Sequence, residues 1–496
     1  NGEPFRLKEE LTVRQPVSRC SAGFRGEIMV DSHSFDPVGA TWLEYFGQSF
    51  YHQTIVPLLV LTVILAWFAA PSTSETLPLG FRSFQIRYLA GWCLCVAADW
   101  LQGPYVYALY SAYGYSKNEN ARLFVAGFGS SLVFGCFVGS LADQFGRKKS
   151  ALAYCLCYIL SCMTKHVNIY WVLMLGRILG GIATSLLFSC FECWMVSEHQ
   201  GRHSFSGGLL GYMFGLMYQL MYVVAILSGM LAQFAADSHP LQPIREGSAT
   251  HFGGATAPFD CAIVMLLIGA VHIATTWHEN YGASSSSTST GQQGGIVGVM
   301  GEAISSVKRD RRVFLLGVVV ACFEGAMFAF VFNWTPALED KHSPPPLGLI
   351  FSAFMMACMC GASIGTISGP VLQPDSRVFL VCATGVASFF VIVFAVSKHY
   401  LRTCFAAFLL FECMVGVYFP SVGVLKSEVV PEHVRSTVYN IYRVPLNGVV
   451  VCLLLTNLSM LRCYGLCASL ILLALVSVAA IKKSPPLPLG VAKQSV

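Results

Sequence analysis

Long apolar runs dominate the chain and follow one another with only short polar connections. Twelve of them lie between Arg87 and Lys483, each close to or above the ~20 residues that a helix needs to cross a bilayer. Their approximate bounds are 88–110, 121–142, 149–166, 169–195, 208–235, 259–277, 313–336, 347–369, 378–397, 402–425, 437–458 and 463–481. The bilayer core offers backbone groups no water, so such a run crosses it as a helix. The sequence therefore predicts an all-α polytopic membrane protein.

Composition supports this class and argues against several others. Of the 496 residues, 55% are hydrophobic and 11% are charged, whereas about 25% charged is usual in soluble domains. The net charge of +5 is small for this length and favours no nucleic-acid partner. The 19 cysteines fall mostly inside apolar runs, which predicts small buried side chains rather than disulfides. We find no Walker loop, His-Glu-x-x-His helix or nucleophile elbow at a strand-to-helix turn, and expect no enzyme, metal or cofactor.

The runs fall into two groups of six, separated by a longer polar segment. That segment holds a Ser/Thr/Gly run, Ala283–Gly295, and then a basic cluster, Lys308–Arg312, as expected for a flexible cytoplasmic loop. A shorter apolar run, Ile55–Ala70, predicts an extra N-terminal helix and a total of 12–13 spans. The predicted parts are a poorly ordered tail (1–50), the extra helix and its linker (51–80), a six-helix bundle (81–277), the central loop (278–312), a second six-helix bundle (313–483) and a tail (484–496).

The distribution of basic residues predicts the orientation. With alternating spans, fifteen Lys and Arg residues fall on the side of the central loop and eight on the other side. Lys and Arg accumulate on the cytoplasmic side of membrane proteins, so both ends of the twelve-span core are expected in the cytoplasm.

The connection between the second and third runs reads Gly-Ser-Leu-Ala-Asp-Gln-Phe-Gly-Arg-Lys-Lys from Gly139. Gly139 and Gly146 allow close packing and a sharp turn, and Asp143 can cap or pair with a neighbouring helix end. Arg147 and Lys148 hold the loop in the cytoplasm. This ordered set resembles the cytoplasmic loop signature of the major facilitator superfamily. The alternative is an ordinary tight hairpin of a polytopic protein.

Several ionisable residues fall within the apolar runs, where each costs a few kcal/mol and is a candidate functional group. They are Asp99, which shares a helix face with Gln102, and then Arg177, Glu324, Glu412 and Arg443. The fork of donors on a guanidinium matches two oxygens of an oxyanion, so we expect the arginines to bind an anion while the carboxylates carry protons. The alternative is a set of interhelical ion pairs that hold the bundle together, and Arg443 could pair with the loop of Asp143.

Two further charged residues lie nearer the cytoplasmic ends of their runs. Glu192 and Lys426 occupy matching positions in a weak internal repeat, each followed six residues later by Glu-His. We expect both to latch a gate, and the Glu-His pairs at 198–199 and 432–433 to be solvated.

Glycine and proline are predicted to break three runs, at Gly103-Pro104, at Gly416 with Pro420, and at Pro445. Broken helices at membrane depth tend to line cavities, which favours a moving carrier over a rigid scaffold.

The runs also contain motifs of a narrower family. The segments are Ala97–Tyr105, Leu160–His166, Gly176–Ser189, Phe323–Gly325, Asn333–Leu338 and Arg443–Asn447. They resemble the molybdate-anion transporter family, from about Phe81 to Lys483. The resemblance implies the major facilitator fold, molybdate as the substrate and a cell membrane as the location.

Electrostatics limits how such a dianion could be taken up. Moving two negative charges inward against ~100 mV costs about 4.6 kcal/mol, so uptake needs a coupled ion or an opposing gradient, and coupling to protons is the expectation. Two alternatives stay open: a carrier of another anion or an organic solute, and a sensor or scaffold with a carrier fold that transports nothing.

Overall fold

A computed structural model describes residues 49–135, 137–281, 296–340, 344–431, 435–456 and 458–483. Nearly all of the predicted tail (1–50), the whole of the Ser/Thr/Gly run and the second tail (484–496) lie outside these residues.

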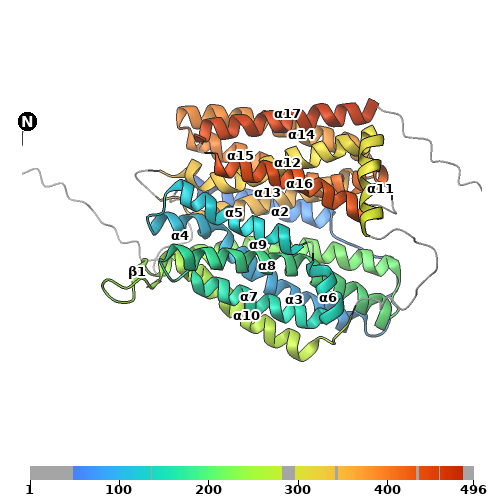
Figure 1. Ribbon diagram of the computed structural model, residues 1–496, viewed down its shortest axis with the longest axis horizontal. Coiled ribbons are helices and arrows are strands. Elements are labelled where there is room, and N and C mark those ends of the chain that lie inside the picture. The colour runs from blue at the N-terminus through green and yellow to red at the C-terminus, as the bar shows by residue number, and fades with distance from the viewer. Residues whose placement is uncertain are drawn as a thin grey trace, which may run out of the picture. The chain divides into compact units, whose positions relative to one another are not determined.

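The described chain is almost entirely helical, in the order that the apolar runs predict (Figure 1). The extra helix and the N-terminal half comprise α2 (Phe50–Phe68), α3 (Phe81–Gln102), η1 (Gly103–Tyr105), α4 (Val106–Ala112), α5 (Lys117–Gly135), α6 (Val138–Phe145), α7 (Arg147–Thr164), α8 (Tyr170–Ser197), η2 (Glu198–Arg202), α9 (Gly207–Ser238), β1 (Gln242–Pro243), β2 (His251–Phe252), η3 (Gly254–Thr256) and α10 (Ala257–Thr276). The C-terminal half comprises α11 (Ile296–Arg309), α12 (Arg311–Leu338), α13 (Leu347–Ser368), α14 (Pro374–Lys398), α15 (Leu401–Val429), α16 (Arg435–Leu455) and α17 (Met460–Lys483).

Nine of the described helices are long and apolar enough to cross a membrane by composition alone. The helices α3, α5, α7 and α16 pack among them and complete the thirteen spans, although each carries more polar residues. A helix surrounded by other helices can hold polar groups that lipid would not tolerate. The predicted arrangement of two six-helix bundles with one extra N-terminal helix is confirmed.

The two halves meet along two seams, α9 with α13 and α5 with α16. The α9–α13 seam is tight because Gly229 and Gly348 carry no side chains: a Cβ on Gly229 would lie 2.4 Å from Oγ of Ser352. Ser352 in turn donates to the carbonyl of Ile226 at 2.8 Å.

We call the end that carries Arg147 the cytoplasmic end, following the charge bias, and the opposite end the outer end.

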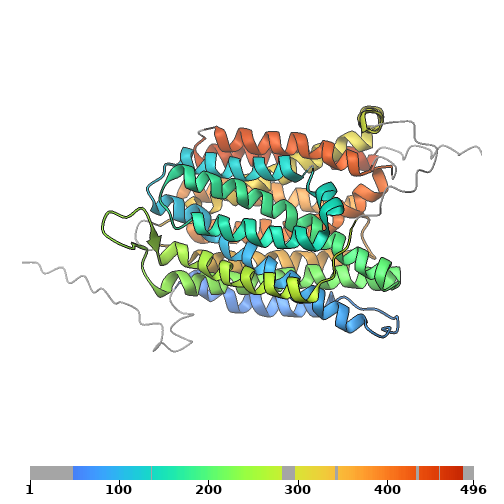
Figure 2. The same cartoon turned by 60° about the horizontal axis from the view of Figure 1, so that its bottom comes forward.

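The extra helix α2 lies along one flank of the molecule and contacts both halves (Figure 2). Thr62 on α2 meets Sγ of Cys360 on α13 at 3.3 Å, and Gln219 on α9 donates to the carbonyl of Ala66 at 3.4 Å. Its remaining face is apolar and exposed, as expected for a helix in contact with lipid.

The predicted turn at Gly139–Lys149 differs from the structure. Residues Val138–Phe145 form the short helix α6, and the chain turns only at Gly146, whose φ of 108° suits glycine.

The predicted proline breaks are also wrong in two of three places. The helix is interrupted at Gly103–Tyr105, by a 3-10 turn, but α15 continues through Pro420 and α16 through Pro445.

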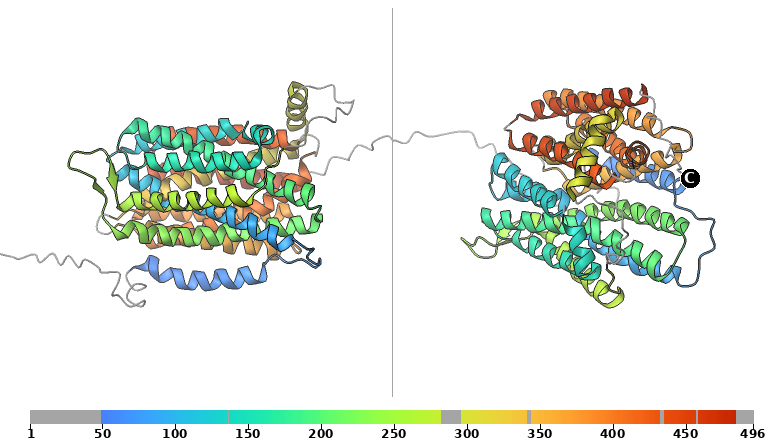
Figure 3. Two further views of the ribbon diagram at one scale, coloured as in Figure 1. Left: turned by 90° about the horizontal axis from the view of Figure 1, so that it is seen from below. Right: turned by 45° about the vertical axis from the view of Figure 1, so that its right-hand side comes forward.

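The central loop is more structured than its composition predicts. Its second part forms α11, which runs across the ends of the bundle helices instead of along them (Figures 1 and 3). Its first residues are tied to the N-terminal half, because Asn280 donates to the carbonyl of Trp194 at 3.2 Å and Trp194 donates to the carbonyl of His278 at 2.7 Å. These first residues of the central loop are therefore anchored to the N-terminal half, and the predicted flexible run, Ala283–Gly295, lies outside the described residues.

At the outer end, β1 and β2 form a small hairpin that covers the connection between α7 and α8. Asn168 donates its backbone N–H to the carbonyl of Ala249 at 2.7 Å, and His251 donates to the carbonyl of His166 at 2.8 Å.

Candidate functional site

Asp99 in the N-terminal half lies near the end of α3, one turn before the helix is interrupted at Gly103. The hydroxyl of Tyr158 on α7 donates a hydrogen bond to its Oδ1, and the charge of Arg177 on α8 acts on both groups. Three helices of one half therefore bring together a carboxylate, a phenol and a guanidinium.

Arg177 is held against α5 at a place where a glycine makes room for it. Its Nε donates to the carbonyl of Leu123 at 3.2 Å, and its guanidinium carbon lies 4.8 Å from the ring centroid of Phe124. A Cβ on Gly127 would lie 2.6 Å from Nη2 of Arg177. The side chain is only half-buried, so donors of the guanidinium remain accessible to a ligand.

The C-terminal half repeats this chemistry on the corresponding helix. Glu324 lies on α12, the first spanning helix of its half, as Asp99 lies on the first helix of the other. The hydroxyl of Tyr418 donates to Oε1 of Glu324 at 3.2 Å, and Nζ of Lys426 lies 3.7 Å from the same oxygen. Each half thus pairs an acid with a tyrosine and a cation.

Glu412 on α15 is the most buried of the predicted carboxylates, with 6% of its surface exposed. Its Oε2 accepts from the thiol of Cys358 on α13 at 3.1 Å, and its charge acts on Tyr222 of α9, across the seam between the halves. In the described part of the chain no Lys or Arg forms an ion pair with it.

Two of the predicted binding residues do not point into a shared site. Gln102 is buried and donates back to the carbonyl of Ala98 in its own helix at 3.0 Å, because the helix is about to end. The side chain of Arg443 is exposed, although its charge reaches Glu324. Arg443 is not the partner found for Asp143, which pairs with Arg147 at 2.7 Å.

The two predicted latch residues have separate surroundings. Lys426 pairs with Glu324 as described, whereas Glu192 accepts from the hydroxyl of Tyr218 at 3.2 Å. Glu192 and Arg147 line a cavity of about 390 Å³ at the cytoplasmic end. The loop residue Lys148 donates from Nζ to the carbonyl of Ala274 on α10 at 2.7 Å.

The prediction that Glu198 and His199 are solvated is wrong. The π-turn η2 folds them inward, so that 3% of Glu198 and none of His199 is exposed. His199 packs edge-on against Phe81 and Phe84. The second Glu-His pair lies outside the described residues.

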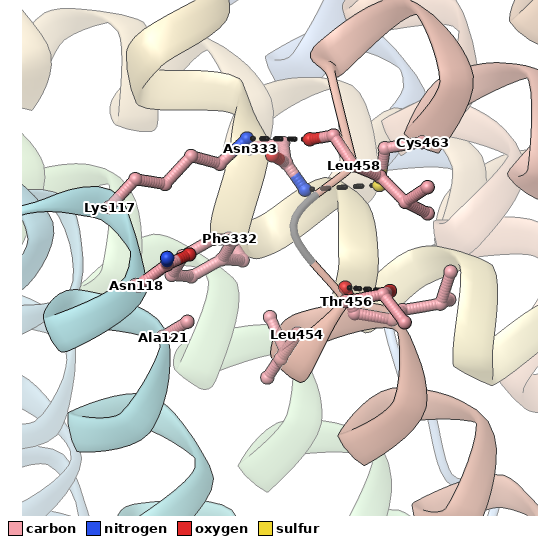
Figure 4. Close-up of a pocket in the computed structure, with 10 residues that line it drawn as sticks. Lys117, Asn118, Ala121, Phe332, Asn333, Leu454, Thr456, Leu458 and Cys463 are labelled. Carbon is pink, nitrogen blue, oxygen red and sulfur yellow. Dashed lines mark hydrogen bonds between the residues drawn. The ribbon is translucent and has the colours of Figure 1, made fainter.

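At the outer end the halves are in contact around a very small cavity (Figure 4). Lys117 on α5 reaches the carbonyl of Leu458, beside α17, at 3.5 Å. Phe332 on α12 meets Tyr107 edge-to-face at 5.4 Å between ring centroids. The cavity holds about 10 Å³, enough for a single water. This end is therefore closed.

Sequence reasoning missed three residues of this region: Tyr158, Tyr418 and Lys165. The tyrosines lie in apolar runs, where an aromatic residue is unremarkable. Lys165 lies at the end of an apolar run, where a lysine is expected to be solvated, but only 1% of it is exposed. The signal that could have found the tyrosines is their position opposite an intramembrane acid, which requires knowledge of helix neighbours.

Two six-helix halves, closed at one end and carrying paired acids and cations within the membrane, define a membrane carrier with the major facilitator fold. A family described as sugar transporters with 12 transmembrane segments matches residues 50–415. The molybdate-anion transporter of Xenopus laevis is 34% identical over 418 residues, 81% of this chain and 86% of the relative. That of Takifugu rubripes is 33% identical over 436 residues, 83% of this chain and 86% of the relative. The chain belongs to the molybdate-anion transporter family.

Solved structures agree on the fold. A D-xylose-proton symporter covers 82% of this chain and 98% of its own at 13% identity, with a TM-score of 0.60. An inward open conformation of the xylose transporter XylE from E. coli covers 83% of this chain and 97% of its own at 14% identity, with a TM-score of 0.58.

Proposed function

We propose that the protein carries molybdate across a membrane by alternating access, with Arg177 as the main ligand of the anion. The observation that carries the proposal is that Arg177 is half-buried within the N-terminal half and that its charge acts on Asp99. A guanidinium binds a tetrahedral oxyanion through two parallel hydrogen bonds. The relatives named molybdate-anion transporters support molybdate as the anion.

Uptake of a dianion into a negative cell requires a driving force of about 4.6 kcal/mol at ~100 mV, and protons entering with it can supply this. Glu412 is the best candidate to carry them. It is buried at the seam beside a thiol, and burial away from cations disfavours the charged form of a carboxyl. It also lies where the halves move against each other, so that its access can change between the two sides.

The first experiment measures uptake of labelled molybdate by cells that lack their own carriers, for wild type and Arg177→Ala. Saturable uptake that resists excess sulfate and is lost in Arg177→Ala, with equal protein at the cell surface, is the expected result. Uptake by wild type that sulfate abolishes would favour a carrier of another oxyanion. Wild-type protein at the cell surface that takes up nothing would favour the sensor or scaffold.

The second experiment tests proton coupling in proteoliposomes. An imposed inward proton gradient should accelerate molybdate uptake by wild type and have no effect on Glu412→Gln. Glu428→Gln is the matched control, since Glu428 lies exposed on the same helix. A rate of molybdate uptake by wild type that does not change with the gradient would count against protons as the coupled ion.

We further propose the plasma membrane as the location, because net uptake from outside requires it. Surface labelling of intact cells expressing the protein tests this.

A further inference from the structure

Lys165 is a buried lysine in the turn that follows α7, directly before the connection to α8. Its exposed fraction is 1%, and its ammonium group has no hydrogen-bond partner among the described residues. The ammonium lies 5.9 Å from the ring centroid of Tyr110, whose own hydroxyl is also buried and without a described partner. Two residues in contact therefore each have a buried donor that meets no acceptor in the described part of the chain.

The surroundings of Lys165 place it beside Arg177. A Cβ on Gly176, the residue before Arg177, would lie 1.8 Å from Oγ1 of Thr164 and 2.9 Å from Nζ of Lys165, so this glycine makes room for both side chains. The charges of the two cations act on each other, and the charge of Arg177 also acts on Tyr110. Like charges brought together in a buried place are costly unless an anion joins them.

The balance of charge indicates which anion fits. The negative charge of Asp99 offsets the single positive charge of Arg177, so the pair has no net positive charge to match a dianion. Lys165 supplies a second positive charge, and a proton on Asp99 would free the first. The two cations can only donate hydrogen bonds, and the phenol hydroxyl can donate one. The four oxygens of a tetrahedral oxyanion accept hydrogen bonds, so all three groups suit it.

We propose that Lys165 is the second cationic ligand of the transported anion and that it sets the preference for a dianion over a monoanion. This inference rests on the proposed function and extends it. The anion lies between Arg177 and Lys165, and the hydroxyl of Tyr110 donates to it. Lys165 is therefore a specificity-determining residue and not a structural cation.

The test compares two tetrahedral oxyanions of similar size, molybdate with two charges and perrhenate with one. Binding of each to the purified protein is measured by calorimetry for wild type, Lys165→Met and Lys165→Arg. Methionine keeps the length and suits the apolar surroundings, so the variant should fold. Lys165→Gln provides the same test if it does not. Lys398→Met, at an exposed lysine of the outer end, is the control.

Wild type and Lys398→Met should prefer molybdate. Lys165→Met should lose about tenfold or more in molybdate affinity, as expected for a charge-assisted contact, and little in perrhenate affinity. Lys165→Arg should keep most of the preference. An unchanged preference in Lys165→Met, in a wild type that binds molybdate, would overturn the role of Lys165 and leave the proposed function standing. A folded wild type that binds neither anion would overturn both.

Discussion

Nζ of Lys426 lies 3.7 Å from Oε1 of Glu324, and both side chains are more than four-fifths buried in the C-terminal half. Truncating one member leaves the other as an uncompensated charge in the membrane. Lys426→Met should therefore lower the unfolding free energy by roughly 1–3 kcal/mol, whereas the double variant with Glu324→Gln should recover much of it. Thermal melting of wild type and the two variants in one detergent provides the comparison. A double variant no more stable than Lys426→Met would argue that the two charges act independently.

In the C-terminal half, α13 and α15 approach each other closely at two glycines. A Cβ on Gly361 would lie 1.9 Å from the carbonyl oxygen of Cys413, and a Cβ on Gly416 would lie 2.0 Å from that of Cys358. Neither backbone can give way easily, so Gly361→Ala and Gly416→Ala should each destabilise the protein by about 1–3 kcal/mol. Gly423→Ala on α15 meets open space and is the matched control. Melting temperatures that fall equally in all three variants would contradict the close contact.

The outer end contains an ion pair that depends on pH. Nε2 of His166 lies 3.2 Å from Oδ1 of Asp260. Burial opposes the charged imidazole, but the hydrogen bond and charge of Asp260 outweigh it and raise the pKa of His166. The pair's contribution is therefore full below the unfolded pKa of about 6.5 and is lost as pH rises through the higher folded value.

Wild type should consequently gain more thermal stability than Asp260→Asn when the pH falls from about 8.5 to 6. The gain should be small because 55% of the Asp260 side chain is exposed, and solvent screens such pairs. If thermal stability depended on pH equally in the two proteins, His166 would not be the titrating group.

The cytoplasmic start of α7 is capped by a side chain from the beginning of the central loop. Oε1 of Glu279 accepts from the backbone N–H of Lys148 at 2.8 Å, and Oε2 accepts from that of Lys149 at 3.2 Å. Loss of a helix cap costs about 1 kcal/mol, and the carboxylate also meets the positive end of the helix. Glu279→Ala should therefore be less stable than Glu279→Gln, and both less stable than wild type, in thermal melting. A Glu279→Ala variant as stable as wild type would show that water replaces the cap.

The same contact explains why residue 146 must be glycine. Its φ is 108°, and a Cβ there would lie 2.6 Å from the Glu279 carboxyl. Gly146→Ala should reduce stability and transport together, whereas Gly201→Ala, at a cytoplasmic glycine with open space around it, should change neither. Transport assays at matched surface expression would distinguish these outcomes.

Helix order and the two-half architecture could be predicted because they follow from the length and spacing of apolar runs, a signal that each segment carries alone. The course of the helices at Pro420 and Pro445 could not be predicted in this way. Both prolines remain inside continuous helices, and neighbouring helices decide whether the carbonyl that loses its hydrogen bond to proline is tolerated. Glu198 and His199 look like loop-end residues in sequence, and only the π-turn η2 buries them.

The candidate site was predictable as a set of charges but not as a set of partners. Asp99, Arg177, Glu324 and Glu412 stand out because charges are rare in apolar runs. Tyr158 donates to Asp99 and Lys426 pairs with Glu324, and both contacts depend on which helices are neighbours. Lys165 was hidden for the same reason, since its burial depends on the packing of α7 against α8.

The most direct measurement for the account is calorimetric titration of molybdate into the purified protein in lipid nanodiscs, with wild type and Arg177→Met side by side. Arg177→Met keeps the apolar stem of the side chain and removes its donors. We expect wild type to bind one molybdate per chain and the variant to bind at least about tenfold more weakly while melting as a folded protein. Equal binding by the two proteins, or none by a folded wild type, would contradict the central role of Arg177.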